Sequence, residues 1–150
     1  MANERQYTSR RAGITTALAK KIGEIDGRGL YHQSIAETSP RLKFWDEVEE
    51  FPAVHLNAGS ETRQYQASGY KDRFLVITIR CYVNEEDAQF HLNALMEDVE
   101  TVIEENSNLQ YLDKQNNEFN CQQITVISIT TDEGVLEPFG VGELEVEVRY

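Results

Sequence analysis

The sequence predicts an α+β fold, in which a mostly antiparallel or mixed sheet of about four to five strands carries two helices on one face and a protruding hairpin arm. Two segments have apolar residues at helical spacing, and several others alternate apolar and polar residues as strands do. A polar, turn-rich segment separates two of the strands. At 150 residues, the chain has the length of one domain, and a single domain spanning 1–150 is expected.

The first helix is predicted over residues 9–25. Ser9 is a suitable N-cap, and Gly27 and Gly29 follow the helix as stop signals. The apolar residues recur at helical spacing, at Ile14, Leu18, Ile22 and Ile25.

Residues 26–56 give weaker signals. Ser39-Pro40 marks a turn, and Phe44-Trp45 has the character of an aromatic anchor in front of the acidic residues 46–50. A short strand is predicted over residues 51–56.

The arm is predicted over roughly residues 57–72. Ala58-Gly59-Ser60 is a turn signal, and residues 61–66 are weakly strand-like but polar on both faces. Because such a segment cannot bury much surface, we expect it to stand off the body of the domain.

The clearest strand covers residues 73–83, with one apolar side formed by Leu75, Ile77, Ile79, Cys81 and Val83. A second helix is expected from an Asn84 cap to about Glu105, with the three acidic residues after Asn84 favoured by the helix dipole. Phe90 falls on its polar side, as do the pairs Glu97-Asp98 and Glu104-Glu105.

The C-terminal region predicts two more strands. Residues 106–117 are expected to form a polar loop, residues 121–131 a strand, and Asp132-Glu133-Gly134 the turn that closes it. The last strand, 141–150, alternates between an apolar face and a charged one. The charged face carries Glu143, Glu145, Glu147 and Arg149.

The charge distribution limits the functional classes. Residues 1–28 hold six basic and three acidic residues, whereas residues 29–150 hold eight basic and twenty-three acidic ones, for a net charge of −12 overall. Such an acidic body disfavours tight binding to nucleic acid, although DNA could still slide past it. No apolar run is long enough to span a membrane, and no secretory leader is evident, so we expect the protein to remain where it is made.

The sequence predicts neither an enzyme nor a cofactor or metal site. It lacks the GxSxG, P-loop, HExxH and GxGxxG motifs, and Gly134, Gly140 and Gly142 are interpreted as turn glycines. His32, His55 and His91 lie on three separate elements, and the common interpretation of each is a packing or surface residue. Cys81 and Cys121 lack metal-ligand spacing and are expected to be buried in strands.

Two features have both a structural and a functional interpretation. The row Glu143, Glu145 and Glu147 is either an ordinary solvated sheet face or an acidic wall that faces a channel when several copies form a ring. Phe90 is either a single exposed aromatic residue or an anchor between subunits.

The C-terminal half resembles the tail terminator and neck-type proteins of tailed bacteriophages. The resemblance covers roughly residues 70–150 and rests on a strand ending near Tyr82, an amphipathic helix with acidic residues before it, and a particular ending. That ending consists of Thr131-Asp132-Glu133-Gly134, then Pro138-Phe139-Gly140, then a strand that reaches Tyr150.

The resemblance implies a virion protein, assembled in the host cytoplasm, that forms a ring, typically a hexamer, at the head-proximal end of the tail tube. Such a ring stops tube polymerisation, contacts the tube protein and the head connector, and lets DNA pass without specific binding. Interface candidates are Glu61, Arg63, Tyr65 and Phe90. Alternatives are another neck or head–tail completion ring protein, a monomeric adaptor or a small cytosolic enzyme.

Overall fold

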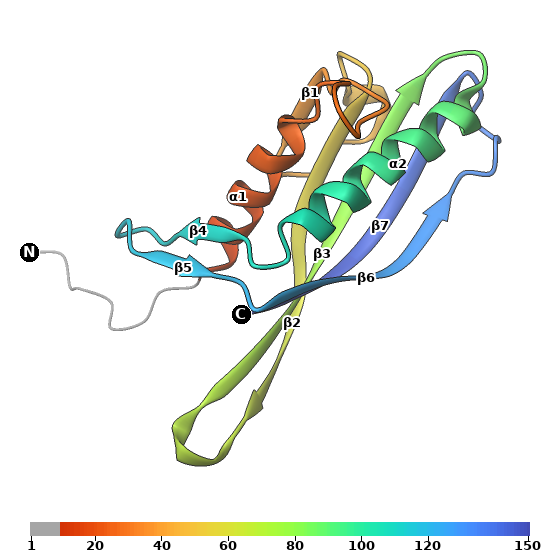
Figure 1. Cartoon of the computed structure of the whole chain (residues 1–150). Coiled ribbons are helices and arrows are strands. Elements are labelled where there is room, and N and C mark those ends of the chain that lie inside the picture. Colours follow the sequence, from red (N-terminus) through yellow and green to blue (C-terminus); the bar gives the residue numbers. More distant parts are fainter. Residues whose placement is uncertain (1–9) are drawn as a thin grey trace, which may run out of the picture.

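The computed structural model describes residues 10–150, and it consists of a twisted sheet with both helices on one face and a long hairpin that extends beyond the sheet (Figure 1). The elements, in chain order, are α1 (Arg11–Gly23), β1 (Glu37–Ser39), a 3-10 turn (Trp45–Glu47), β2 (Ala53–Tyr65), a second 3-10 turn (Ala67–Gly69), β3 (Lys71–Asn84), α2 (Ala88–Glu105), β4 (Gln110–Leu112), β5 (Glu118–Asn120), β6 (Gln123–Thr131) and β7 (Phe139–Arg149).

The main sheet has five strands in the order β1-β2-β3-β7-β6. β1 runs parallel to β2, and every other pair in this sheet is antiparallel. β4 and β5 form a separate two-stranded sheet. This arrangement confirms the predicted α+β class with a mixed sheet.

The core lies between the main sheet and the two helices. β3 contributes the five side chains that the alternation predicted, from Leu75 to Val83, and all of them are buried. They belong to one apolar cluster with residues of α1, such as Leu18, and of α2, such as Leu92. The hydrophobic effect therefore fixes both helices on the same face of the sheet, as expected from their apolar stripes.

Gly140 and Gly142 lie within β7 rather than in a turn, which corrects the interpretation from sequence. A Cβ atom on Gly142 would lie 2.6 Å from the Met96 sulfur and 3.1 Å from a Leu92 methyl group. The absence of a side chain at Gly142 therefore lets α2 pack closely against the middle of the sheet.

Both helix starts differ from the prediction. α1 begins at Arg11, and the predicted cap Ser9 lies outside the described residues. α2 begins at Ala88, because Asn84 still pairs with Phe139 in the β3–β7 ladder and the Glu85 N–H donates to the Pro138 carbonyl. Asn84 is therefore the end of a strand and not a helix cap.

The structure contains three short strands that the sequence did not indicate. β4 and β5 form a hairpin within the segment that includes the predicted polar loop, and β1 adds an edge to β2. Each has only three residues, too few for an alternation pattern to stand out. Conversely, β2 is longer than predicted and continues through the arm to Tyr65.

Asp98 is buried, which contradicts its predicted place on the solvent side of α2. Its carboxylate oxygens each accept a backbone N–H at 2.8 Å, one from His32 and one from Gln33. Asp98 thereby fastens the connection between α1 and β1 to α2. Among residues 10–150, neither helix has the length and hydropathy needed to cross a membrane.

Candidate assembly surfaces

The hairpin arm is formed by the ends of β2 and β3 that extend past the rest of the sheet. β2 and β3 stay paired from Glu61↔Leu75 to Tyr65↔Lys71, whereas the pairing of β3 with β7 begins only at Phe74. Figure 1 shows the paired strands extending away from the helices and from β7. The expected arm is thus present as a two-stranded extension, but it begins later than the predicted residue 57. Asn57 and Ala58 belong to the body of the sheet, because their partners Thr78 and Ile77 also pair with β7.

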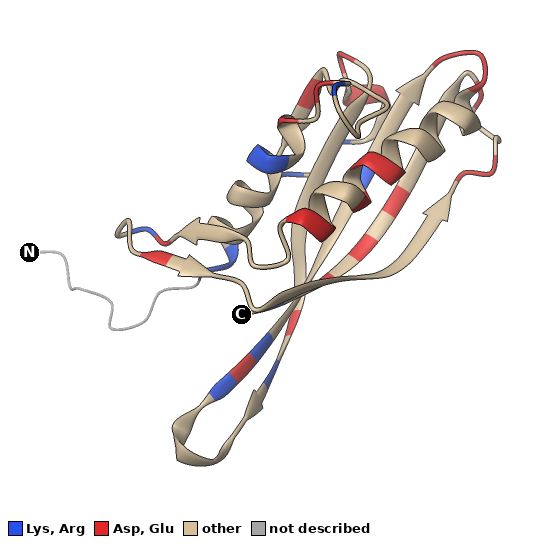
Figure 2. Ribbon diagram, viewed as in Figure 1, with Lys and Arg blue, Asp and Glu red and all other residues tan. Residues whose placement is uncertain are grey.

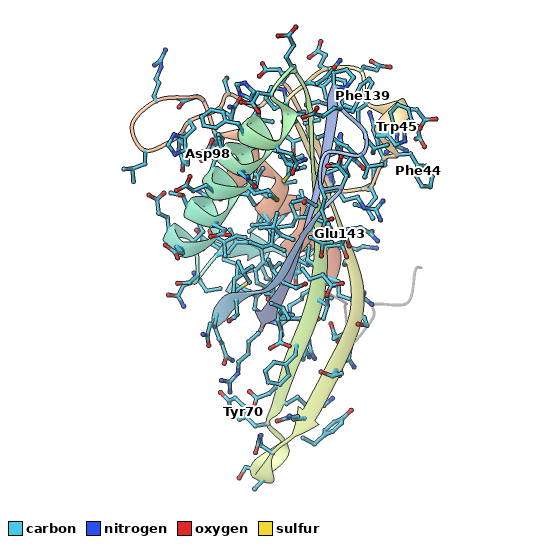
Figure 3. All side chains as sticks on the ribbon, turned by 90° about the vertical axis from the view of Figure 1, so that its right-hand side faces the viewer. Phe44, Trp45, Tyr70, Asp98, Phe139 and Glu143 are labelled. Atoms are coloured by element: carbon cyan, nitrogen blue, oxygen red, sulfur yellow. The ribbon has the colours of Figure 1, made fainter. Side chains whose placement is uncertain are left out.

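Two tyrosines lie near the tip of the arm, and both are largely exposed, Tyr65 by 70% and Tyr70 by 71%. Tyr70 lies near the far end of the molecule in Figure 3. The connecting turn places Ser68 and Gly69 at φ angles of 72° and 75°, a left-handed conformation that glycine adopts without strain. Large aromatic groups at the end of a polar arm are well suited to contact another protein.

The predicted interface residues of the arm have different environments. Glu61 faces its own chain, because its carboxylate accepts hydrogen bonds from the Tyr150 hydroxyl and from Arg63 Nε, the latter at 2.7 Å. Arg63 is partly exposed beside it, and Tyr65 points into solvent. The arm therefore presents Tyr65 and part of Arg63 outward, and the interface role of all three residues stays a prediction.

The base of the arm is basic although the chain is acidic. Arg149 Nη2 donates to Asp72 at 2.9 Å, and the guanidinium groups of Arg10 and Arg73 lie 5.1 and 5.6 Å from the centre of the Tyr150 ring. Figure 2 shows both basic and acidic residues on the arm, whereas acidic residues gather at the opposite end of the molecule. The two ends of the molecule therefore differ in charge.

The end opposite the arm carries an aromatic cluster next to acidic residues. Phe139 packs against Trp45 and Phe51, with ring centroids 5.2 and 5.8 Å apart, and Phe44 and Trp45 are exposed (Figure 3). The acidic residues that follow Trp45 are mostly exposed too. The aromatic anchor proposed from the sequence is thus half packed against β7 and half open to solvent.

The glutamate row lies on the sheet face turned away from the helices. Glu143, Glu145 and Glu147 alternate with buried residues of β7, and all three are half-buried. Glu143 lies opposite Arg80, with 3.5 Å between its Oε2 and the arginine Nε, while Glu145 lies opposite Thr78. The row is therefore an acidic strip with Arg80 opposite one end and Arg149 next to the other, compatible with either interpretation given above.

Phe90 is 65% exposed on α2. Its ring meets the His91 ring edge-on at 5.4 Å, and it borders a shallow hollow of about 230 Å³ with His32, Ala94 and Glu97. The predicted position on the polar side of the helix is confirmed, and its role between subunits stays a prediction.

The three histidines are separated, and each has its own acidic partner. His91 Nε2 lies 2.7 Å from Glu85, and His32 Nε2 lies 3.4 Å from Glu97. No group of three or more histidine, cysteine or acidic side chains in residues 10–150 has the arrangement of a metal site.

His55 is fully buried beneath the segment that contains β1. Its Nε2 lies 2.6 Å from Glu37 Oε2 and its Nδ1 lies 2.7 Å from Ser39 Oγ, while Lys43 Nζ donates to Glu37 at 3.3 Å. Burial lowers the pKa of His55, although Glu37 opposes this shift. The chain of contacts from Ser39 through His55 to Glu37 has the residue types of a hydrolytic triad. However, the imidazole is fully buried, so a substrate could not reach it from solvent.

The cysteines are buried as predicted, Cys81 in β3 and Cys121 immediately after β5 instead of within a strand. Burial raises the pKa of both thiols, that of Cys121 to about 12. Buried thiols of this kind are unreactive packing residues.

Comparison with known proteins decides the family. Residues 8–150 match the family model described as Bacteriophage Tail Tube Terminator Protein. The chain belongs to the bacteriophage tail tube terminator family. It is therefore a structural protein of the phage virion and not an enzyme. The resemblance noted over residues 70–150 extends over nearly the whole chain.

One relative of this chain is the tail tube terminator protein p142 of Escherichia phage T5. The two are 36% identical over 149 residues, covering 93% of this chain and 92% of the relative. The fold is also similar to that of a chain in the virion of a native gene transfer agent particle, with a TM-score of 0.57, 6% identity, and coverage of 91% of this chain and 93% of that one.

Sequence reasoning missed the contacts that connect distant elements of the fold. Tyr150 bonds to Glu61, His55 to Glu37, and Asp98 to the backbone of Gln33. The polar partners in each pair are far apart in sequence. The sequence did give one indication that Asp98 could be buried, because it lies next to Val99 at the edge of the apolar stripe of α2.

Proposed function

We propose that the chain, acting as one domain over residues 1–150, forms a closed homo-oligomeric ring, a hexamer, at the head-proximal end of the tail tube. The ring ends tube polymerisation and docks to the head connector. The observation that carries this proposal is the polarity of the subunit, which has an arm with exposed tyrosines and a basic base at one end, and an acidic end with exposed Phe44 and Trp45 at the other. A ring of such subunits has two chemically different faces, one for each partner.

A ring is favoured by the open sheet. Heterologous contacts between two different surfaces of identical subunits generate a closed ring when the rotation between neighbours closes. The main sheet has two unlike edges, β1 with the arm on one side and β6 on the other. Unlike edges support head-to-tail contacts between neighbours.

The lumen is assigned to the sheet face with Glu143, Glu145 and Glu147. That face is free of the helices, and a wall of carboxylates repels the phosphates of DNA. DNA then passes through without specific binding. The p142 relative and the family description name a tail tube terminator, which supports contact with the tube protein.

The alternative role is that of a neighbouring ring, as a neck or head–tail completion protein. The acidic, aromatic end of the molecule would suit that position too, since it presents a surface for a protein partner. Labelling the protein in intact particles separates the two roles. Label at the tube tip supports the terminator, and label only on the head side supports the alternative.

The first experiment tests whether the arm is needed to cap the tube. Replacing residues 65–71 by Asn-Gly keeps the Gln64↔Asp72 pair and supplies a favoured two-residue hairpin turn. We expect the unfolding midpoint to stay within the error of the wild type, while co-sedimentation with tail tubes is lost and tubes grow beyond their normal length. The control is Glu104→Gln on α2, which should cap normally.

Light scattering over a range of concentrations, with and without tubes, then gives the oligomeric state. Six copies at the tube tip support the proposal. A shortened-arm variant that still caps tubes would remove the arm from the mechanism, and a wild-type chain that never self-associates on tubes would overturn the ring.

A further inference from the structure

The exposed aromatic pair Phe44 and Trp45 lies on a short turn that is tied to the main sheet. The Glu47 N–H donates to the Phe44 carbonyl at 2.9 Å, which closes the 3-10 turn. The Tyr82 hydroxyl, from β3, donates to the Lys43 carbonyl just before the pair. The backbone that carries the two aromatic residues is therefore fixed directly beside them.

The carboxylate of Glu37 holds the same turn from both ends. Its Oε2 accepts a hydrogen bond from Lys43 Nζ and its Oε1 accepts one from the Glu49 N–H, each at 3.3 Å. Val48, which lies between these two contacts in the sequence, is buried in a small cluster with Ala53. Because the turn is already ordered, a partner that binds its exposed side chains loses little free energy to ordering them.

The two aromatic side chains are open to solvent to different degrees. Phe44 is 66% exposed, whereas Trp45 is 43% exposed and packs against Phe139 of β7. Figure 3 shows the three residues at the end of the molecule opposite Tyr70. Exposed aromatic rings on a fixed backbone have the character of a binding hot spot, since they bury a large apolar area at a small cost in conformational entropy.

The surface around the pair is acidic. Residues 44–54 include four acidic residues and no basic one. All four acidic residues are exposed, at Asp46, Glu47, Glu49 and Glu50. The nearest preceding basic residue, Lys43, is bound to Glu37. A partner that covers the aromatic pair must therefore bring positive charge, because an acidic surface would be repelled and an apolar one would desolvate the carboxylates without compensation.

Charge and position argue against the other occupants. Nucleic acid carries phosphates, which these carboxylates repel. A second copy offers basic groups at the base of its arm, at the opposite end of the subunit, so in the proposed ring they face away from this turn. The same ring uses the arm for the tube protein. The remaining occupant is a basic protein on the head side of the ring.

We propose that Phe44 and Trp45, with the carboxylates around them, form the docking surface for an arginine- and lysine-rich surface of the head connector. Guanidinium groups of the partner stack on the exposed rings, and its other cations pair with the surrounding carboxylates. The charges speed the encounter, and the rings contribute most of the affinity. The inference rests on the proposed function, and it adds which end of the subunit meets the head and what chemistry that end binds.

Joining of purified tails to DNA-filled heads tests this surface. Tails are assembled with the variant protein and mixed with heads that lack tails, and joined particles are counted by electron microscopy. We expect Phe44→Ala to lower the yield about tenfold or more, because an aromatic anchor is removed. Tail length and the unfolding midpoint should stay normal, since the ring is mostly exposed. The control Leu112→Ala changes an apolar residue that is 46% exposed on β4, away from this end, and should join normally (Figure 1).

The double variant Glu47→Lys, Glu50→Lys tests the sign of the partner's charge. It should slow joining about tenfold or more at low salt. Added salt should slow the wild type and reduce its difference from the variant, because screening weakens attraction and repulsion alike. The control Glu104→Lys, Glu118→Lys makes the same change in net charge at exposed positions on α2 and β5, and it should join like the wild type.

Cross-linking identifies the occupant. Asp46→Cys places a thiol beside the aromatic pair, and the native Cys81 and Cys121 are both buried. A linker with one maleimide and one succinimidyl ester therefore attaches at residue 46 and captures lysines of the protein that lies against it. Mass spectrometry of joined particles should show attachment to a head connector protein. Attachment to the tube protein or to a second copy would overturn the inference.

Failure of this inference can be distinguished from failure of the proposed function. If the Phe44 and Glu47/Glu50 variants cap tubes at normal length and join heads at the wild-type rate, the docking surface is wrong and the proposed ring stands. If these variants give tubes of abnormal length, this end contacts the tube and the inference is wrong. Faster joining of the wild type at high salt would mean that the partner is acidic, which also overturns it. If the wild type neither self-associates on tubes nor caps them, the proposed function fails and the inference fails with it.

Discussion

The hydroxyl of Tyr150 donates a hydrogen bond to the carboxylate of Glu61, which joins the C-terminal end of β7 to the base of the arm. Burial and the nearby Glu61 carboxylate raise the pKa of Tyr150. Burial alone would raise the pKa of Glu61, but the hydrogen bonds from Tyr150 and Arg63 bring it below its usual value. The direction in which the arm leaves the sheet is therefore held by a charged hydrogen bond between buried groups.

Tyr150→Phe is expected to lower the free energy of unfolding by about 1.5–3 kcal/mol, because a hydrogen bond to a charged group is lost and Glu61 stays partly buried. Urea denaturation measures the change. Tyr65→Phe removes a hydroxyl from an exposed tyrosine of the arm and should leave stability unchanged. Equal stability of the Tyr150→Phe protein and the wild type would show that the contact contributes nothing.

Asp98→Ala is expected to destabilise the fold by about 1–3 kcal/mol, since the backbone N–H groups of His32 and Gln33 would lose their acceptor. Denaturant unfolding gives the change, and faster amide exchange at Gln33 should localise it. Glu97→Ala, at the adjacent exposed carboxylate, should stay within about 0.5 kcal/mol of the wild type. Comparable losses in both variants would rule out a specific role for the buried carboxylate.

Long periodic segments were predictable from sequence because burial imposes their pattern. β3 and β7 alternate over many residues, so their inner faces were identified correctly, from Leu75 to Val83 and from Leu144 to Tyr150. The arm was predictable for the opposite reason, since a segment that is polar on both faces has no surface to bury. These signals together were sufficient for the fold class.

Contacts between distant polar residues could not be predicted in the same way. Asp98 has the composition of a solvent-exposed position, and only the fold shows that two backbone N–H groups meet its carboxylate. Asn84 has the chemistry of a helix cap, but its pairing with Phe139 in the ladder determines its conformation. The exposed edge of β6 likewise depends on strand order, which no local pattern specifies.

Phe90→Ser is expected to weaken association between subunits without changing the stability of the monomer, because the ring is exposed and contributes little to the core. The concentration dependence of mass in light scattering measures the effect. The control is Asn93→Ala, which changes an exposed residue nearby on α2. Gln89→Ala is not suitable, because Gln89 Nε2 donates a hydrogen bond to Asp132. An unchanged assembly state of Phe90→Ser would remove this residue from the interface.

Charge reversal of the glutamate row tests the proposed lumen. If the ring places Glu145 and Glu147 toward DNA, the double variant Glu145→Lys, Glu147→Lys should slow DNA ejection from phage particles. The introduced lysines would attract the DNA phosphates that the carboxylates repel. Added salt should restore the rate by screening. Glu104→Lys, on the helix side of the sheet, should eject DNA normally. Unaltered ejection by the double variant would place the row outside the channel.

The buried cluster of His55, Glu37, Ser39 and Lys43 makes the free energy of unfolding depend on pH. Burial holds the pKa of His55 below its usual value of 6.5, so the folded protein binds this proton more weakly than the unfolded chain. The groups that face the imidazole are Glu37, Lys43, Arg41 and Tyr82.

The sign of the effect follows from the depressed pKa. The contribution of neutral His55 is present in full above about pH 6.5 and is lost as the pH falls below that value toward the lower pKa of the folded state. The pKa of Glu37 is also below its usual 4.5, because hydrogen bonds from His55, the Glu49 N–H and Lys43 outweigh its burial. Its contribution is lost only at still lower pH, below about 4.5.

Urea unfolding from pH 7.5 to pH 5 should therefore show a falling free energy of unfolding for the wild type. His55→Gln should be less stable at pH 7.5 and should have a flatter profile. His91→Gln, which changes a half-exposed histidine paired with Glu85, should keep the wild-type slope. If the free energy of unfolding of His55→Gln still fell with pH as steeply as that of the wild type, another group would be responsible. The imidazole of His55 would then bind its proton equally well in the folded and unfolded states.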